Sequence, residues 1–412
     1  MAILGCIADD FTGASDMASF LVKGGMRTIL YNGIPSVPME TQDIDALVIA
    51  LKTRTQNTEN AVSVSLQAIQ WLQKNGCTHY YIKYCSTFDS TETGNIGPIC
   101  DAVMDYLKVH YTLLCPALPV NGRTVQNGNL YVNGIPLHHS SMKDHPLTPM
   151  WDCDLKKLME PQSRYTVYKI GNNPDQWNPP HSDPHYYLVP DCENEEDCRK
   201  IVEYFGHETL LTGGSGLACT LAKKLLENRN TLPGSRKNRD PATGNVLLLA
   251  GSCSETTRKQ ITYFQNHGGY SIQITPEAIL DPSWNIRTFW RDIQKKLQDH
   301  HVLIYSSETP ERVRQIQETF GDVSCKLEET ASSLAQFASE NGICKIVSAG
   351  GETSGAVTKK LGFQSFIIGE SIAPGVPMMI PKEKPNMKLV LKSGNFGQED
   401  FFVRAIQLLD AK

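Results

Sequence analysis

Short apolar runs alternate with longer amphipathic stretches through the first hundred residues. Apolar runs predict strands at 2–7, 27–33, 46–54 and 79–87. Helices are predicted at 15–25, which stops at a Gly-Gly pair, and at 60–76, where Val62, Leu66, Ile69 and Leu72 fall on one helical face. Strands that alternate with helices, with polar residues at the strand ends, indicate a mainly parallel α/β sheet with a site along that edge.

The alternation of predicted strands and helices is interrupted twice. Residues 116–190 are rich in Pro, Gly and Asn, with a hairpin expected in NGNLYVNGIPL, and we interpret them as an irregular insertion. Residues 228–244 are polar, rich in turn formers and without periodicity, and we interpret them as a linker. Since 412 residues exceed one ordinary domain, we predict two α/β domains, 1–227 and 245–412, with the active site in the cleft between them.

Charge and composition exclude several function classes. The net charge is -5, and no basic stripe is interleaved with aromatic residues, so nucleic acid is not an expected partner. Every apolar run is far shorter than the roughly 20 residues that span a bilayer, and no signal sequence is recognisable at the N-terminus, so we expect a cytoplasmic protein without a membrane partner. The 12 cysteines form no CxxC pair and are expected to be reduced core residues rather than zinc ligands.

Two adjacent aspartates, Asp9 and Asp10, lie where the first strand ends and a helix begins. One of them is explained as a helix N-cap. The pair together has two interpretations, solvated loop carboxylates or a functional pair.

Later in the same half, residues 83–98 (KYCSTFDSTETGNIGP) place hydroxyls, a carboxylate, an amide and glycines after a strand, and these groups suit the binding of a small polyol acid. Lys83 and Arg54 have two interpretations: they supply the cation for the carboxylate of such an acid, or they are solvated charges at strand ends.

Three loops rich in Gly and Ser follow strands in the second half. The first is SAGGETSGAV at 348–357, which is neither a Walker A loop nor GxGxxG. The second contains Ser252 and Ser254, with Ser252 and Glu255 in capping-box spacing, and the third contains Gly394. If these loops meet at one sheet edge, their backbone N–H groups suit nucleotide phosphates. Lys392, beside SGN, is a candidate phosphate charge or a solvated lysine.

Seven motifs carry a resemblance over almost the whole chain: IADDFTGASD, LKTR, FDSTETGNIG, PVNGRT, HPLTPM, GGETSGAV and SGNFG. In this order they resemble the four-carbon acid sugar kinase family, most closely its 3-oxo-tetronate branch. The resemblance implies an N-terminal sugar-acid-binding domain and a C-terminal ATP-binding domain. It also implies ATP-dependent phosphorylation of the C4 hydroxyl of a four-carbon acid.

On this basis we assign expected roles. Phosphoryl transfer needs an oriented hydroxyl, a carboxylate for its proton, and Mg²⁺ against the phosphates. Asp9 and Asp10 suit the tasks of orienting the acid, acting as base or holding Mg²⁺ through water, and Asp89 is the rival base; no direct protein ligand to the metal is expected. The expected substrate-binding residues are Arg54, Lys83, Ser90, Thr91 and Asn95. The expected ATP-binding residues are Ser252, Ser254, Gly350, Gly351, Glu352, Thr353, Ser354 and Gly394.

Several alternatives stay open at this point. D-Threonate and D-erythronate kinases resemble DSTLRGNIG, whereas this chain has Glu92 and Thr93 in the variable positions and lacks the guanidinium, which favours the oxo acid. A nicotinamide-dependent oxidoreductase is disfavoured without GxGxxG. A non-catalytic sugar-acid sensor would not need three phosphate-type loops. His145, in the loop MKDHPLTPM, is either a substrate contact or a turn residue, and homo-oligomerisation is left open.

Overall fold

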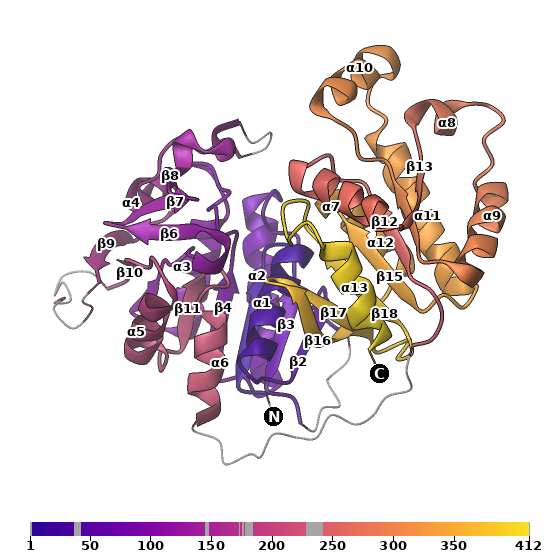
Figure 1. Cartoon of the computed structure of the whole chain (residues 1–412). Coiled ribbons are helices and arrows are strands. Elements are labelled where there is room, and N and C mark those ends of the chain that lie inside the picture. Colours follow the sequence, from indigo (N-terminus) through magenta and orange to yellow (C-terminus); the bar gives the residue numbers. More distant parts are fainter. Residues whose placement is uncertain are drawn as a thin grey trace. The chain divides into compact units, whose positions relative to one another are not determined.

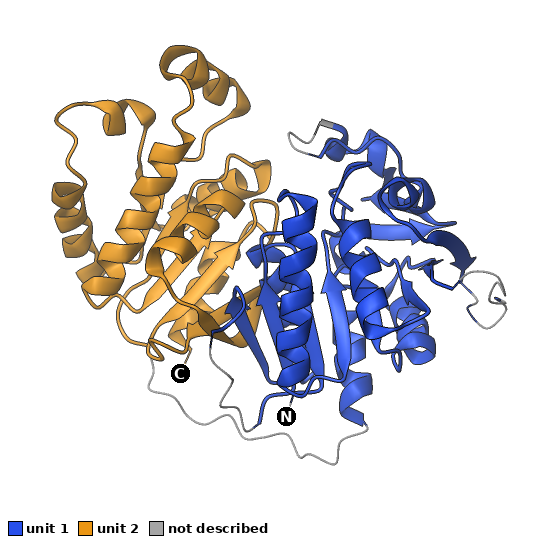
Figure 2. Cartoon of the chain, turned by 180° about the vertical axis from the view of Figure 1, so that it is seen from behind, with its two compact units in different colours: residues 1–235 blue, residues 236–412 orange. Residues whose placement is uncertain are grey.

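The computed structural model describes residues 2–36, 43–144, 148–172, 174, 177, 184–227 and 242–411. His145 and most of the predicted linker, residues 228–241, lie outside the described residues. The chain divides into two compact units, Met1–Ser235 and Arg236–Lys412 (Figure 2). None of the helices within the described residues is long and apolar enough to cross a membrane.

Unit 1 is built on a parallel five-stranded sheet in the order β11-β4-β1-β3-β2 (Figure 1). These strands are almost completely buried, as expected of parallel strands covered on both faces. They span Leu4–Ala8 (β1), Thr28–Asn32 (β2), Ala46–Ala50 (β3), His79–Lys83 (β4) and Leu210–Gly213 (β11). The helices are α1 (Phe11–Lys23), α2 (Thr58–Lys74), α3 (Ile96–Leu107), α4 (Leu155–Met159), α5 (Glu195–Phe205) and α6 (Ala218–Glu227).

Helix α2 buries a slightly different face from the one that its pattern predicts. Ile69 and Leu72 are buried as expected, but Ala61 and Ser65 are also buried, while Val62 and Leu66 lie at the half-buried margin. Small side chains therefore occupy the centre of the packed face, and the larger aliphatic residues flank it.

The segment 116–190 contains ordered elements beyond the expected hairpin. One small antiparallel sheet is formed by β6 (Arg123–Gln126), β7 (Asn129–Val132) and β8 (Ile135–Pro136). A parallel sheet in the order β5-β10-β9 joins Tyr111–Leu113 (β5), Thr166–Gly171 (β9) and Tyr186–Pro190 (β10). Within the described part of this segment, short 3-10 helices also lie at Pro119–Asn121, Leu137–His139, Ser141–Asp144 and Glu160–Gln162.

Unit 2 contains seven strands in the order β16-β17-β18-β15-β12-β14-β13. The pairs β16–β17 and β17–β18 are antiparallel and the others are parallel. The strands are β12 (Leu247–Ala250), β13 (Tyr270–Gln273), β14 (Val302–Tyr305), β15 (Lys345–Ala349), β16 (Ser365–Ala373), β17 (Val376–Pro381) and β18 (Lys388–Lys392). The helices are α7 (Glu255–Asn266), α8 (Pro276–Leu280), α9 (Ile286–Asp299), α10 (Pro310–Phe320), α11 (Ser324–Glu340), α12 (Gly351–Leu361) and α13 (Phe401–Asp410).

Each unit has one place where the order of its strands reverses. In unit 1, β3 and β2 lie on one side of β1, and β4 and β11 lie on the other. The reversal therefore lies between β1 and β4. In unit 2 the corresponding reversal lies between β12 and β15. Ligands of open α/β sheets bind at the carboxyl ends of the strands beside such a reversal. The two reversals therefore mark where a ligand site is expected in each unit.

Candidate functional site

Arg54 is the centre of a charged cluster at the carboxyl ends of β1, β3 and β4. Its Nε lies 2.8 Å from Asp9 Oδ2 and its Nη2 3.1 Å from Asp9 Oδ1, a bidentate pair. Its Nη2 also lies 2.6 Å from Asp10 Oδ2, and its Nη1 3.5 Å from Asp89 Oδ2. The interpretation of Asp9, Asp10 and Arg54 as independent solvated charges is therefore wrong. The structure brings together all three candidate carboxylates on one guanidinium.

Asp10 has a second role at the start of α1. It is the N-cap of that helix, and its side chain accepts a hydrogen bond from the Gly13 backbone N–H. A Cβ atom at Gly13 would lie 2.9 Å from an Asp10 carboxylate oxygen and 3.2 Å from Lys83 Nζ. A side chain here would therefore displace the Asp10 carboxylate, because the first turn of α1 approaches these charged groups closely.

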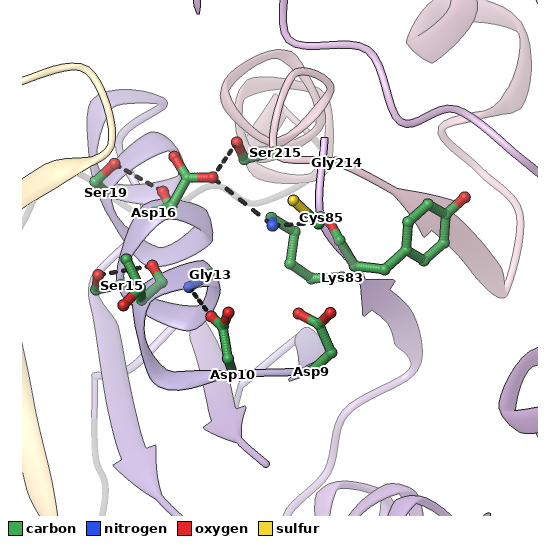
Figure 3. Close-up of polar contacts among 12 residues, drawn as sticks. Asp9, Asp10, Gly13, Ser15, Asp16, Ser19, Lys83, Cys85, Gly214 and Ser215 are labelled. Atoms are coloured by element: carbon green, nitrogen blue, oxygen red, sulfur yellow. Dashed lines mark hydrogen bonds and ion pairs between the residues drawn. The ribbon is translucent and has the colours of Figure 1, made fainter. Parts of the chain in front are cut away.

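Lys83 points toward the aspartates (Figure 3), and only 3% of its side chain is exposed. Its Nζ donates to the Tyr84 carbonyl at 2.9 Å and lies 3.8 Å from Asp16 Oδ2. Burial alone would lower the pKa of Lys83, but the Asp16 and Asp9 carboxylates outweigh it and hold that pKa above its ordinary value. Lys83 is therefore a buried cation at the end of β4 and not a solvated one.

Sequence reasoning missed two members of this cluster, Asp16 and Ser215. Asp16 lies on α1 and accepts a hydrogen bond of 2.5 Å from the Ser215 hydroxyl, which follows β11. Burial raises the pKa of Asp16, although Lys83 and Ser215 oppose the shift. Burial also raises the pKa of Asp9, against the effect of Arg54. Asp16 stands inside the quoted motif IADDFTGASD, so the motif itself could have indicated it, whereas Ser215 carries no such signal.

Asp89 is oriented by a strained turn after β4. Phe88, immediately before it, is completely buried and adopts a φ of 52°, which is uncommon for a bulky residue. Thr87 donates a hydrogen bond of 2.6 Å to Asp89 Oδ1. The turn therefore directs the other carboxylate oxygen of Asp89 toward Arg54.

The other expected substrate residues differ in how much their side chains are already engaged. Asn95 donates to the Thr53 and Gln56 carbonyls at 2.7 and 2.8 Å and accepts from Thr58 Oγ1 at 2.8 Å. Ser90 is buried and donates to Gln162 Oε1 at 3.0 Å. The hydroxyl of half-buried Thr91 has a longer contact, 3.5 Å, with Thr93. Asn95 and Ser90 thus hold the loop in shape, and Thr91 is the freest of the three.

A pocket that is partly open to solvent adjoins this cluster. Its lining includes Asp9, Arg54, Lys83, Asp89 and Ser90 together with apolar residues from the ends of the strands and from α3. Cations and carboxylates on an apolar wall can bind a small polar acid and can hold a proton at a defined oxygen.

In unit 2 a larger pocket, of about 990 Å³ with part of it open to solvent, lies at the reversal between β12 and β15. Gly350 joins β15 to α12 with a φ of 131°, and a Cβ there would lie 3.0 Å from the Ser252 backbone nitrogen. Gly351 begins α12 without a side-chain cap, and a Cβ at Gly351 would meet nothing within 4 Å. The helix terminus therefore presents backbone N–H groups to an accessible space, as an anion site requires. The lining includes Gly251, Ser252, Gly350, Gly351, Glu352 and Thr353 from the expected loops.

The second and third loops meet one another behind this pocket. Ser254, and not Ser252, is the N-cap of α7, so the capping box predicted for Ser252 and Glu255 is wrong. Ser252 instead accepts from the Ser254 backbone N–H at 3.2 Å. Ser254 donates to the Gly394 carbonyl at 2.8 Å, and a Cβ at Gly394 would lie 2.3 Å from Ser252 Oγ. The helix therefore starts two residues later than the spacing suggests because Ser252 caps a turn.

Two residues of this region differ from the expectations for them. Ser354 is buried and its hydroxyl points back to the sheet, 3.3 Å from the Ser348 carbonyl oxygen and 3.4 Å from the Lys392 carbonyl oxygen. Lys392 is completely buried, so its interpretation as a solvated strand-end lysine is wrong. Ser354 therefore supports the loop from beneath rather than lining the pocket.

Comparison with known proteins identifies both units. A family model described as a sugar-binding N-terminal domain matches residues 4–221, and one described as a nucleotide-binding C-terminal domain matches residues 247–402. The chain is 40% identical to the 3-oxo-tetronate kinase of Brucella melitensis, over 98% of this chain and 94% of that protein. It is 39% identical to the 3-oxo-tetronate kinase of Haemophilus influenzae, over 97% of this chain and 98% of that protein.

Solved structures agree with this relationship. A Haemophilus influenzae protein superposes with a TM-score of 0.80 at 38% identity, over 99% of this chain and 100% of that one. A Salmonella typhimurium LT2 protein superposes with a TM-score of 0.86 at 37% identity, over 98% and 99%. The resemblance drawn from the seven motifs is confirmed. The chain belongs to the family in which a sugar-binding N-terminal domain precedes a nucleotide-binding C-terminal domain, the family of the 3-oxo-tetronate kinases.

Proposed function

We propose that this protein is an ATP-dependent kinase that phosphorylates the C4 hydroxyl of 3-oxo-tetronate in sugar-acid catabolism. The observation that carries the proposal is the 40% identity to a curated 3-oxo-tetronate kinase over nearly the whole of both chains. The D-threonate and D-erythronate alternatives are not favoured, because relatives from several bacteria share the 3-oxo-tetronate kinase name. A non-catalytic sensor is not favoured for the same reason.

The two domains divide the ligands between them in this proposal. Residues 1–227 bind the sugar acid, residues 228–244 form the linker, and residues 245–412 bind ATP. The matched ranges 4–221 and 247–402 support this division. We place the reaction in the cytoplasm with small-molecule ligands only, and leave homo-oligomerisation open.

Asp10 is the proposed general base. Its side chain is 35% exposed, against 11% for Asp9 and 6% for Asp89, so a substrate hydroxyl reaches it most readily. Asp9 is committed to Arg54 through both carboxylate oxygens and orients that guanidinium. Asp89 supports Arg54 from the opposite side and remains the rival base. Asp10 would thus accept the proton of the C4 hydroxyl as the phosphoryl group is transferred.

Arg54 and Lys83 are the proposed partners of the substrate carboxylate. The Nη1 edge of Arg54 has the longest carboxylate contact, 3.5 Å to Asp89, and is the edge we assign to the acid. Lys83 contributes positive potential from its buried position, and Thr91 offers a hydroxyl to the substrate oxygens. Ser90 and Asn95 support this loop through the contacts described above.

The nucleotide is assigned to the pocket of unit 2. Backbone N–H groups at Gly351, Glu352 and Thr353 would approach the phosphates, with Gly350 and Ser252 beside them, while Ser254, Ser354 and Gly394 hold the loops in place. Mg²⁺ binds through few carboxylates and keeps several waters. The half-buried carboxylate of Asp10 in unit 1 and the exposed carboxylate of Glu352 in unit 2 are each of a kind that can hold it through water. When bound, Mg²⁺ neutralises phosphate charge.

A coupled assay tests the proposed function. The protein is incubated with ATP, Mg²⁺ and a panel of 3-oxo-tetronate, D-threonate and D-erythronate, and ADP is measured. We expect ADP release with 3-oxo-tetronate and a product whose phosphorus is coupled to the C4 protons in NMR spectra. ADP release only with the reduced acids would contradict the substrate assignment, and no release with any acid would contradict the kinase assignment.

A further inference from the structure

Lys392 lies at the end of β18 and uses all three ammonium protons within the protein. Its Nζ donates to Thr257 Oγ1 at 3.0 Å, to the Ser393 carbonyl at 3.1 Å and to the Gly394 carbonyl at 3.0 Å. The Nζ also lies 5.6 Å from the centre of the Phe401 ring, within the range of a cation–π interaction. The side chain therefore joins the first turn of α7 to the β18–α13 loop.

The backbone of Lys392 reaches a third segment. Lys392 pairs with Ala349 in the β15–β18 ladder, and its carbonyl accepts a hydrogen bond of 2.9 Å from the Gly350 N–H. Gly350 is the glycine with a φ of 131° that opens the pocket loop. One residue thus connects all three loops that were assigned to the nucleotide.

The pocket itself has the wrong charge for a polyphosphate. Among the described residues, its lining contains no lysine or arginine, and four acidic residues contribute to it: Glu308, Asp322, Glu328 and Glu352. Backbone N–H groups provide only partial positive charges. A full positive charge behind the loops would offset the acidic lining without touching the ligand.

We propose that Lys392 is a positioning residue for the nucleotide, whose buried ammonium holds the three loops together and supplies positive potential beneath the phosphates. This inference rests on the proposed function, because it requires a nucleotide in the unit 2 pocket. Lys392 does not contact the ligand in this account and acts through the loops that do.

The protonation of Lys392 should change when a nucleotide binds. Burial lowers the pKa of Lys392 from 10.5 to about 7. No described carboxylate forms an ion pair with the Nζ of Lys392. The adjacent elements α7, β15, α12 and α13 carry these charged residues: Glu255, Arg258, Lys259, Lys345, Glu352, Lys359, Lys360, Arg404 and Asp410. Asp400 precedes α13 as its N-cap. A bound polyphosphate favours the charged form, so nucleotide binding should raise the pKa of Lys392 and take up a proton near neutral pH.

Calorimetry tests this inference with the full chain. ATP is titrated at pH 7 in two buffers with different ionisation enthalpies, into the native protein and into Lys392→Met and Lys392→Arg. For the native protein we expect uptake of roughly half a proton per ATP beyond that seen in Lys392→Met, and an affinity that falls as pH rises above 7. Lys392→Met should weaken ATP binding at least tenfold, and Lys392→Arg should keep the affinity within a few-fold but lose the proton uptake because arginine stays charged.

Thr257→Val is the matched control, because it removes one hydrogen bond to Lys392 and keeps the charge. It should retain the proton uptake. Thermal unfolding, recorded on the same samples, shows that each variant is folded. Native ATP affinity and proton uptake in folded Lys392→Met would overturn the inference. If neither Lys392 variant folds, the native protein decides, since ATP affinity independent of pH between 6 and 8 contradicts the inference. No ATP binding by the native protein would instead overturn the proposed function.

Discussion

The sites of the two units lie at the same position, the carboxyl ends of parallel strands beside a reversal of strand order, but use different chemistry. In unit 1, the ends of β1, β3 and β4 bring together aspartates on one arginine, with a buried lysine beside them. In unit 2, the ends of β12 and β15 present glycines, hydroxyls and backbone N–H groups, and the buried ammonium of Lys392 donates to the Gly394 carbonyl without lining the pocket. The topology fixes where a ligand is held, and the residues after each strand decide which ligand it is.

This difference also explains which side chains can be exchanged. In unit 1 the charges compensate one another, so removing one leaves others without a partner in a partly buried setting. In unit 2 the important feature is the space that glycines leave open, so adding a side chain is the damaging change. The predictions below use removal in the first site and addition in the second.

The largest expected effect is that of Asp10→Asn on turnover. The amide keeps the size of the side chain but loses its charge and basicity, so turnover should fall by about 10²–10⁴ if Asp10 is the base. Steady-state kinetics with 3-oxo-tetronate measures it. Asp9→Asn and Asp89→Asn are the matched variants, and a residue that only orients the acid should mainly raise the apparent KM. Near-native turnover and affinity in all three folded variants would place the site elsewhere.

The next largest effect is expected for Arg54→Ala, on the affinity for the acid. Loss of a charge-assisted pair costs a few kcal/mol, so Arg54→Ala should weaken binding of the acid by on the order of a hundredfold while ATP binding changes little. The variant also leaves Asp9, Asp10 and Asp89 without their shared partner, so its thermal unfolding is recorded first. A neutral four-carbon sugar is the control ligand. Equal losses for the acid and the neutral sugar would mean that Arg54 only supports the fold.

A smaller effect, a roughly tenfold loss of ATP affinity, is expected for Gly351→Val. The added side chain would enter the space in front of the α12 N-terminus and keep phosphates away from the backbone. Gly355→Val is the matched control, since Gly355 lies one turn further along the same helix and a Cβ there also meets nothing within 4 Å. Calorimetry should show weaker ATP binding for Gly351→Val alone. Equal affinities in the two variants would remove the loop from the nucleotide site.

Lys392 gives a prediction on stability. Its pKa is lowered in the folded protein, so between about pH 7 and 10.5 the unfolded chain binds more protons at this residue than the folded one. Its contribution therefore makes the free energy of unfolding rise with pH across that window. Denaturant titrations of the nucleotide-free protein at pH 7 and pH 9 measure the change. Lys392→Met should show a smaller rise, and an identical rise in both proteins would contradict the assignment.

Much of the unit 1 site could be predicted because it follows from topology. Residues after neighbouring parallel strands meet at one edge, so Asp9, Arg54 and Asp89 could be grouped without coordinates. The contact between Arg54 and Asp9 could not be predicted, because an arginine at a strand end can pair either with a substrate carboxylate or with a protein carboxylate. Ser215 pairs with Asp16 across the fold, and a lone serine carries no sign of that. Lys392 was missed as a buried residue because lysine is ordinarily solvated, and only the packing of Thr257 and Gly394 around it reveals the burial.

The central claim is that the acid and the nucleotide bind to separate sites of opposite chemistry. Its most direct test is a crossed binding experiment, in which 3-oxo-tetronate and ATP are each titrated into folded Arg54→Ala and Gly351→Val. The account predicts that the first variant loses affinity for the acid and keeps it for ATP, and that the second shows the reverse. A folded variant that loses both affinities to the same extent, or neither variant losing the affinity assigned to it, would contradict the account.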